Sequence, residues 1–262
     1  MENKREYTDE ERIVRVWDVE NVKKLVYKRG YYIANEWRAR ELDELWVSEA
    51  EYSQTASFGR NTGWYVGMEN IRRYYVEKHE ADIRARQNAL GRRVEGMSVE
   101  DAGLYSGFLS SHPATTGLIR LAGDGKTARG IFYSIAHETA PRADGTAEAL
   151  WVPEKQAYDF VKQADGWRIW HVVHATDLVC PAGGDFSKLS PYADYDNNPV
   201  MQEFATPTIP CICHDSTFNW WDNYPPVPGE YETFSVETSY GPEGYHAPEG
   251  VYLRAGEGRN YL

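Results

Sequence analysis

The chain has 262 residues, of which 42% are hydrophobic and 26% charged, as in an ordinary globular protein. Its net charge of −12 at pH 7 argues against a nucleic acid or an anionic membrane as partner. No apolar run approaches the ~20 residues of a membrane span, and the opening residues MENKREYTDEE lack the apolar core of a signal peptide, so a cytoplasmic location is expected.

Three helices are predicted in the first part of the chain. Apolar residues recur at helical spacing after Asp18, a plausible N-cap. A short second helix carries Ala39, Leu42 and Trp46 on one face. A third, charged and largely exposed, begins after Gly67.

After residue 110 the hydrophobic period changes to two, which is typical of strands. Strands are predicted at 117–121, 128–137, 147–152, 157–162 and 167–174, and three of their connections are Asp-Gly turns typical of hairpins. Helices followed by an antiparallel meander indicate an α+β domain over 1–179, with helices on one face of a curved sheet.

Residues 180–262 have a different composition, with 10 of the 13 prolines and all three cysteines. Prolines interrupt regular structure, yet the segment is too rich in aromatic residues for a solvated tail. It is predicted to be an irregular arm that packs on the core or on a neighbouring subunit.

Common cofactor motifs are missing from the sequence. It contains no complete phosphate-binding loop, no GxGxxG after a strand and no HExxH. Cys211, Cys213 and His214 lack a standard zinc spacing, so free thiols are the preferred interpretation. We expect neither a metal nor an organic cofactor.

Four segments, in order, carry a resemblance to a known family. They are 63–71 (GWYVGMENI), 112–119 (HPATTGLI), 123–124 (GD) and 165–169 (DGWRI). Over roughly residues 10–178 the chain resembles the SnoaL-like branch of the nuclear transport factor 2-like superfamily. The resemblance implies a cone-shaped sheet around helices with a deep apolar pocket. It also implies cofactor-free proton-transfer chemistry, as in dehydratases, dehydrochlorinases, cyclases, isomerases and a formaldehyde-releasing diarylpropane lyase.

The resemblance also suggests site residues. His112 lies at the position of the pocket histidine in dehydratase-like members, and Asn35 aligns with their usual aspartate. Because Asn35 cannot ionise, no anion is expected to hold an imidazolium, so His112 should be a neutral base near pH 7. Tyr32, and Tyr31 beside it, are candidates to donate a hydrogen bond to a substrate oxygen.

Other aromatic residues complete the predicted pocket. Strand alternation from Trp167 places His171 on the core side, so His171 is predicted to support catalysis. Trp64 and Tyr65 of the first motif are expected to contact the substrate, as are Tyr133 and His137, although the inward-facing parity of their strand is left open.

The predicted function is a cofactor-independent lyase that acts on an aromatic or polycyclic small molecule by C–O or C–C cleavage. The abundance of aromatic residues, 9 Trp, 19 Tyr and 8 Phe, favours such a ligand. The alternatives are an isomerase or cyclase in the same pocket, or a non-catalytic binding domain. A homo-oligomer is expected, with a trimer favoured and a dimer next.

Overall fold

The computed structural model describes residues 6–61, 63–89, 109–141, 147–185, 207–212, 225–244 and 253–254. The helical elements are α1 (Asp9–Ala34), α2 (Arg38–Leu45), α3 (Ala50–Ser53), α4 (Met68–Arg72), the π-helical η1 (Arg73–Lys78), α5 (His79–Ala89) and the 3-10 turn η2 (Val236–Thr238). The strands are β1 (Ser57–Arg60), β2 (Gly63–Val66), β3 (Ser110–Ser111), β4 (Thr115–Leu121), β5 (Thr127–Pro141), β6 (Ala147–Gln163), β7 (Gly166–Thr176), β8 (Cys180–Pro181), β9 (Ile209–Ile212) and β10 (Leu253–Arg254).

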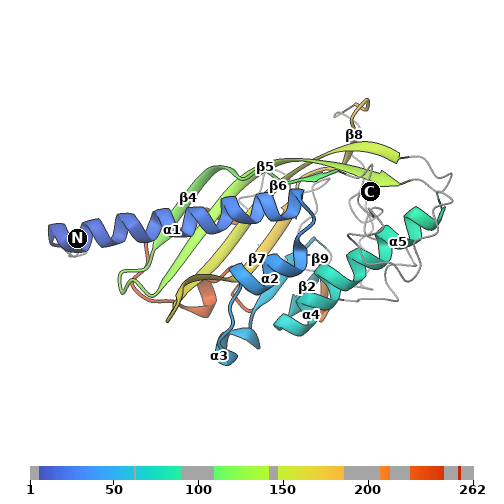
Figure 1. Cartoon of the computed structure of the whole chain (residues 1–262). Helices are drawn as coiled ribbons and strands as arrows, with labels where there is room; N and C mark the ends of the chain where they lie inside the picture. Colours follow the sequence, from blue (N-terminus) through green and yellow to red (C-terminus); the bar gives the residue numbers. More distant parts are fainter. Residues whose placement is uncertain are drawn as a thin grey trace.

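These strands form one curved sheet. Its order is β10-β9-β2-β1-β7-β6-β5-β3, with β4 added beside β5 and β8 beside β6, and only β1 and β7 pair in parallel among the described strands. Figure 1 shows α1 and α2 lying across one face of the long strands. We call this the inner face and its opposite the outer face. The predicted α+β architecture is confirmed.

The two faces bury different apolar clusters. The inner cluster joins α1 and α2 to the sheet through Val26, Trp46, Phe58 and Phe160, among others. The outer face carries a second cluster made of Trp64, Ile131, Ala157, Val173, Ala175 and Tyr240. Both faces of the central strands are therefore covered by other parts of the chain.

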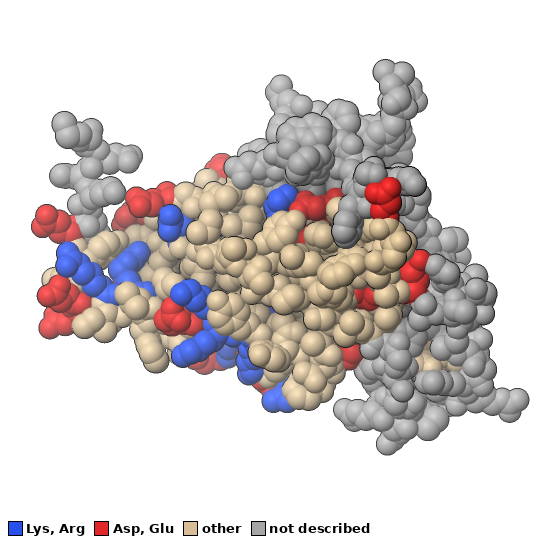
Figure 2. All heavy atoms as spheres, turned by 90° about the horizontal axis from the view of Figure 1, so that it is seen from above, with Lys and Arg blue, Asp and Glu red and all other residues tan. Residues whose placement is uncertain are grey.

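Helix α1 begins ten residues earlier than the sequence predicts. Thr8 is its N-cap, and a capping box joins the Thr8 hydroxyl to the Glu11 amide and the Glu11 carboxylate to the Thr8 amide. Asp18 does not cap the helix, because its carboxylate accepts hydrogen bonds from Trp167 Nε1 at 2.8 Å and Lys162 Nζ at 2.9 Å. The N-terminal part of α1 therefore projects beyond the sheet (Figure 1). Figure 2 shows acidic and basic side chains mixed at this projecting end of the molecule.

The predicted third helix is divided into three segments, α4, η1 and α5. It is also less exposed than expected, since Ile71, Tyr75 and Ile83 are buried. The wider π-helical turn η1 interrupts the α-helical spacing and carries the buried Tyr75.

The strands predicted at 147–152 and 157–162 are a single strand, β6. Pro153, which lies between the two predicted strands, is tolerated for a geometric reason. Its carbonyl accepts from the Asp177 amide at 2.8 Å, so its nitrogen also points away from β5. The pairing of β6 with β5 therefore loses no hydrogen bond at Pro153.

A β-bulge divides β7 into two parts with opposite alternation. Asp159 of β6 pairs with His171, but the next residue, Phe160, pairs with Ile169, so Trp170 is an extra residue. One extra residue moves every later side chain to the other face. The expected alternation through the strand is therefore wrong after Ile169: His174 is on the inner face and His171 on the outer.

The described part of the C-terminal arm packs on the outer face of its own chain. Arg129 donates to the carbonyl of Thr238, and its guanidinium lies 3.9 Å from the centre of the Tyr231 ring. Asp159 accepts from Ser239 Oγ at 2.7 Å and from the Tyr240 amide at 2.6 Å. The segment 207–212 also extends the sheet, where β9 pairs with β2. These described segments therefore contact the core of their own chain. Cys213 and His214 lie outside the described residues.

Candidate functional site

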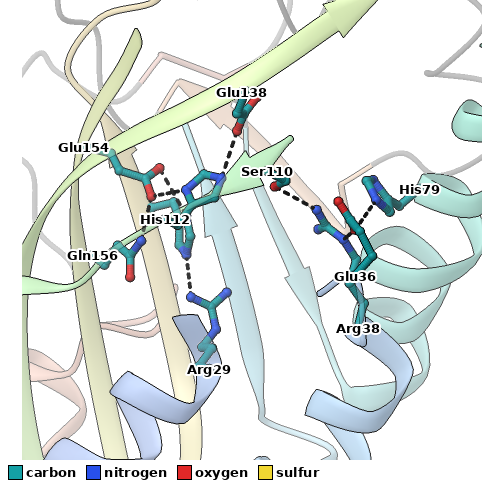
Figure 3. Close-up of polar contacts among 10 residues, drawn as sticks. Arg29, Glu36, Arg38, His79, Ser110, His112, Glu138, Glu154 and Gln156 are labelled. Atoms are coloured by element: carbon teal, nitrogen blue, oxygen red, sulfur yellow. Dashed lines mark hydrogen bonds and ion pairs between the residues drawn. The ribbon is translucent and has the colours of Figure 1, made fainter. Parts of the chain in front are cut away.

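His112 lies between two carboxylates on the inner side of the sheet (Figure 3). It follows the short strand β3 and is 6% exposed. Its Nδ1 is 2.8 Å from Glu154 Oε1 on β6, and its Nε2 is 2.9 Å from Glu138 Oε1 on β5. A carboxylate only accepts hydrogen bonds, so both ring nitrogens of His112 act as donors and the ring is an imidazolium.

Glu154 is the buried anion at the centre of this cluster. Besides His112, its carboxylate accepts from Gln156 Nε2 at 2.7 Å and contacts His174 Nδ1 at 3.1 Å. Burial alone would raise the pKa of Glu154, but the neighbouring His174 and His112 lower it well below its usual value. Glu154 therefore remains charged.

Arg29 of α1 fixes the tautomer of His174. Arg29 Nη1 lies 3.0 Å from His174 Nε2, and a guanidinium can only donate. Nε2 is therefore the acceptor, and Nδ1 carries the proton that it donates to Glu154. Burial lowers the pKa of His174 to about 4, which keeps this ring neutral.

The Arg29 charge is compensated from the other side by Glu41 of α2. Glu41 accepts from Arg29 Nε at 2.8 Å, from Trp46 Nε1 at 3.1 Å and from the Tyr75 hydroxyl at 2.7 Å. The exposed fraction of the Arg29 side chain is 1% and that of Glu41 is 0%. This fully buried pair is rigidly held, because each partner also bonds to neutral groups.

The row Glu41–Arg29–His174–Glu154–His112–Glu138 thus runs through the protein interior. Burial alone would lower the pKa of His112, but the charge of Glu154 and hydrogen bonds to Glu138 and Glu154 raise it to about 9. His112 is therefore a cation at neutral pH. Glu138, with 17% of its side chain exposed, is the more accessible of the two carboxylates that contact His112. His112 can therefore donate a proton, and the neighbouring Glu138 carboxylate can accept one.

His112, Glu154 and His174 have ligand atoms within 4.8 Å of one another, as the ligands of a metal ion would. A metal-bound histidine normally donates a hydrogen bond through its second ring nitrogen. Here Arg29 makes Nε2 of His174 an acceptor, so Nδ1 is protonated and has no lone pair for a metal. This donor set does not fit a metal ion.

The SnoaL-like domain family matches residues 14–173, which include Arg29, Glu41, His112, Glu138 and Glu154 and end one residue before His174. The chain belongs to this family. No curated protein matches it at a significant level.

Solved structures similar to this SnoaL-like chain share little sequence with it. An NTF2-like protein with a cystatin-like fold from Novosphingobium aromaticivorans is 15% identical, covers 67% of this chain and 89% of its own, and has a TM-score of 0.39. A type 2 hexachlorocyclohexane dehydrochlorinase, LinA, is 11% identical, covers 69% and 98%, and has a TM-score of 0.43. Aln2 from a Streptomyces species is 17% identical, covers 66% and 95%, and has a TM-score of 0.38. Matches this distant say nothing about substrate or reaction.

Within this SnoaL-like domain, His112 lies in the cluster, but the expected surroundings of His112 are wrong. Asn35 provides no carboxylate, but Glu154 and Glu138 each place one beside His112, so His112 is charged rather than neutral. Asn35 itself is exposed at the end of α1, where its amide donates to the Tyr31 carbonyl.

The other residues predicted from α1 do not reach the cluster. Tyr31 is 73% exposed. Tyr32 is buried, but its hydroxyl donates to Glu44 Oε2 at 2.5 Å. Their predicted contacts with a substrate at His112 are therefore not supported by this arrangement.

His171 lies on the outer face because of the bulge at Trp170. Its Nδ1 is 2.8 Å from Ser57 Oγ, and a Cβ on Gly241 of the arm would lie 3.2 Å from its ring. Burial lowers the pKa of His171 to about 3, so it stays neutral. The expectation that it shares the core side with Ile169 is wrong.

The remaining predicted residues are divided between the faces. Trp64 belongs to the outer cluster, whereas Tyr65 joins the inner one and stacks on Tyr74 with 3.7 Å between ring centres. Tyr133 and His137 alternate with Phe132 and Ala136 on β5, which places them on the outer face and settles the parity left open. Tyr133 is 37% exposed.

A second polar group lies beside the cluster (Figure 3). Glu36 accepts from Arg38 Nε at 2.9 Å and contacts His79 Nε2 at 2.8 Å, and Arg38 reaches Ser110 Oγ at 3.4 Å. Glu36 has a φ of 57°, a left-handed conformation that costs energy outside glycine. Its contacts hold this conformation and connect α2 to the strand before His112.

Sequence reasoning missed Arg29, Glu41, Glu138, Glu154 and His174. One signal was present: Glu154, Gln156 and Tyr158 are spaced two apart, so a continuous strand places all three on one face.

Among the described residues, no helix is both long and apolar enough to cross a membrane.

Proposed function

We propose that this SnoaL-like protein is a cofactor-independent lyase that cleaves a C–O or C–C bond of an aromatic or polycyclic small molecule. The observation that carries the proposal is the buried imidazolium of His112 between Glu138 and Glu154. Buried titratable groups with opposed, shifted pKa values are typical of sites that transfer protons, and this is what favours a catalytic site over a binding pocket.

In the C–O case the reaction is an elimination of water. His112 donates its Nε2 proton to the departing hydroxyl, and Glu138 accepts the proton from the neighbouring carbon as the double bond forms. The products are an alkene and water, and one proton returns from Glu138 to His112 to restore the resting state. Donor and acceptor are 2.9 Å apart, so both act on one side of the substrate.

The buried part of the row keeps His112 ready for this step. Glu154 stabilises the cation, His174 and Gln156 hold Glu154 in place, and Arg29 orients His174. Positioning groups of this kind avoid reorganisation during the reaction.

An aromatic substrate is supported by the rings that surround the row. Phe58 lies 5.3 Å from the His174 ring and 5.2 Å from the Tyr75 ring, measured between ring centres. The Phe58 and Tyr75 rings are both buried in the inner cluster, so they make the surroundings of the row aromatic and apolar, which suits a flat apolar ligand.

The test is a panel of phenolic dimers and hydroxylated polycyclic compounds incubated with the full chain. New conjugated double bonds are followed by absorbance. Loss of water is followed as the decrease in substrate mass by mass spectrometry, and formaldehyde by a chromogenic assay. His112→Gln keeps the volume but cannot transfer a proton, so we expect kcat to fall by at least ~100-fold with little change in ligand binding. Near-normal turnover by this variant contradicts the role of His112, and binding without conversion favours a binding domain.

A further inference from the structure

The side of α1 that faces away from the sheet is apolar. Its inward side is buried through Val22, Val26 and Arg29. The outward side carries six large apolar residues that are 48% to 73% exposed: Ile13, Val14, Val16, Trp17, Tyr27 and Tyr31. Figure 1 shows α1 in front of the sheet, where no other described element crosses its outer side. An exposed apolar surface of this length usually marks an interaction site.

Four of these apolar residues, together with Glu20 and Lys24, follow the spacing of a helix–helix contact. Ile13, Trp17, Glu20, Lys24, Tyr27 and Tyr31 are separated alternately by four and three residues. This is the spacing of the a and d positions of a coiled coil, in which one narrow seam faces a partner helix. We call these six residues the α1 seam. Apolar residues occupy both ends of the seam, and one acidic and one basic residue occupy its centre.

We propose that the α1 seam binds the α1 seam of a second copy of this chain, in antiparallel orientation about a two-fold axis. In this register Ile13 meets Tyr31 of the second copy and Trp17 meets Tyr27. Glu20 meets Lys24 of the second copy, and by symmetry the pair occurs twice. The self-complementary order of the seam, with apolar ends and opposite charges equidistant from its midpoint, is the reason for choosing a second copy as the occupant.

The central charges also select the orientation. In a parallel pair in register, Glu20 would face Glu20 and Lys24 would face Lys24, which is repulsive. Within one chain Lys24 Nζ lies 4.6 Å from the centre of the Trp17 ring, and Glu20 accepts from Lys23 Nζ at 2.6 Å. Lys24 is therefore held beside Trp17 on the seam, where the antiparallel pair brings Glu20 of the second copy.

The exposed area is adequate for a stable contact. With roughly 150–250 Å² for a large side chain, the six exposed apolar residues of α1 offer about 800 Å² per chain. Four of them belong to the seam, and Val14 and Val16 flank it. The total area exceeds the ~300–600 Å² of the largest apolar patch on a typical monomer. If about two thirds becomes buried, the pair loses roughly 1,000 Å² in total, the lower bound of a specific interface.

The test measures the mass of the full chain by sedimentation equilibrium at several concentrations and at low salt. We expect an even number of copies of the 30.0 kDa chain, with the dimer as the unit. Trp17→Glu should raise the dissociation constant at least ~10-fold, because two buried carboxylates would enter the seam. Val227→Glu, at an exposed apolar residue away from α1, is the matched control and should leave the mass unchanged.

A charge exchange distinguishes the antiparallel seam from other contacts. Glu20→Lys and Lys24→Glu each place like charges opposite one another and should weaken the dimer, whereas the double variant E20K/K24E restores opposite pairs and should recover it. All three residues are on the surface, and thermal melting by circular dichroism verifies the fold. A monomeric wild-type chain at ~100 μM, a trimer, an oligomer insensitive to Trp17→Glu, or a double variant no better than the single ones overturns the proposal.

Discussion

Glu154→Gln tests whether Glu154 controls the charge of His112. The variant keeps the shape of the side chain but removes the buried anion 2.8 Å from His112 Nδ1. The rise of the His112 pKa from 6.5 to about 9 corresponds to about 3 kcal/mol of stabilisation of the imidazolium. Among the groups that raise this pKa, the charge of Glu154 contributes most. In the variant, burial then dominates, and the His112 pKa should fall toward or below 6.5.

The assay is a pH titration of the His112 ring by NMR, with His112→Gln used to assign its signal. The wild-type protein should titrate near pH 9 and the variant at least two pH units lower. Because folding raises the pKa of His112, its contribution to stability is complete below pH 6.5 and is lost as pH rises through about 9. Urea denaturation should show this decrease in the wild-type protein and not in the variant. A wild-type midpoint below 7, or an unchanged midpoint in the variant, would refute the reasoning.

The outer face and α1 give three further predictions. His171→Asn keeps a hydrogen-bonding group near Ser57, and position 171 lies on the face opposite the cluster. We therefore expect kcat to stay within about threefold of wild type. A loss comparable to that of His112→Gln would contradict the assigned face. Burial raises the Asp159 pKa from 3.8 to about 7, so the protein loses stability through this residue as pH rises from about 4 to 7. Asp159→Asn should therefore be more stable than wild type at pH 8, by about 2–4 kcal/mol in urea denaturation. A less stable variant at pH 8 would show that the folded protein favours the charged form. Thr8→Ala removes the N-cap and should cost about 1 kcal/mol in the same measurement, with no loss expected if the projecting turn is frayed.

Local patterns in the sequence were sufficient for the class of fold. The period of two after residue 110 predicts the long strands, since each buries one side on the helices. The family resemblance correctly pointed to the curved sheet and brought attention to His112. The start of α1 could also have been found, because T-D-E-E at residues 8–11 is a capping box.

The cluster itself was harder to predict, for two physical reasons. In 167–174 (WRIWHVVH) both alternations contain large apolar residues, so nothing in the pattern reveals the extra residue at Trp170. Glu154 lies between the predicted strands 147–152 and 157–162, where β6 continues without interruption, so no face was assigned to Glu154. The anion near His112 therefore comes from a different element than the aligned position Asn35, and only the paired strands reveal it.

The bulge at Trp170, and not the sequence of β7 alone, decides which histidine faces the interior. Deleting Trp170 would make the pairing with β6 regular and would keep His171 on the outer face and His174 on the inner, because Asp159 and Phe160 already pair with His171 and Ile169. A relative that keeps all of these residues but pairs them without a bulge would instead have His171 on the inner face, toward Glu154, and His174 on the outer. Pairwise alignment across this point carries a hidden ambiguity, and residues that share a column need not share a side of the sheet.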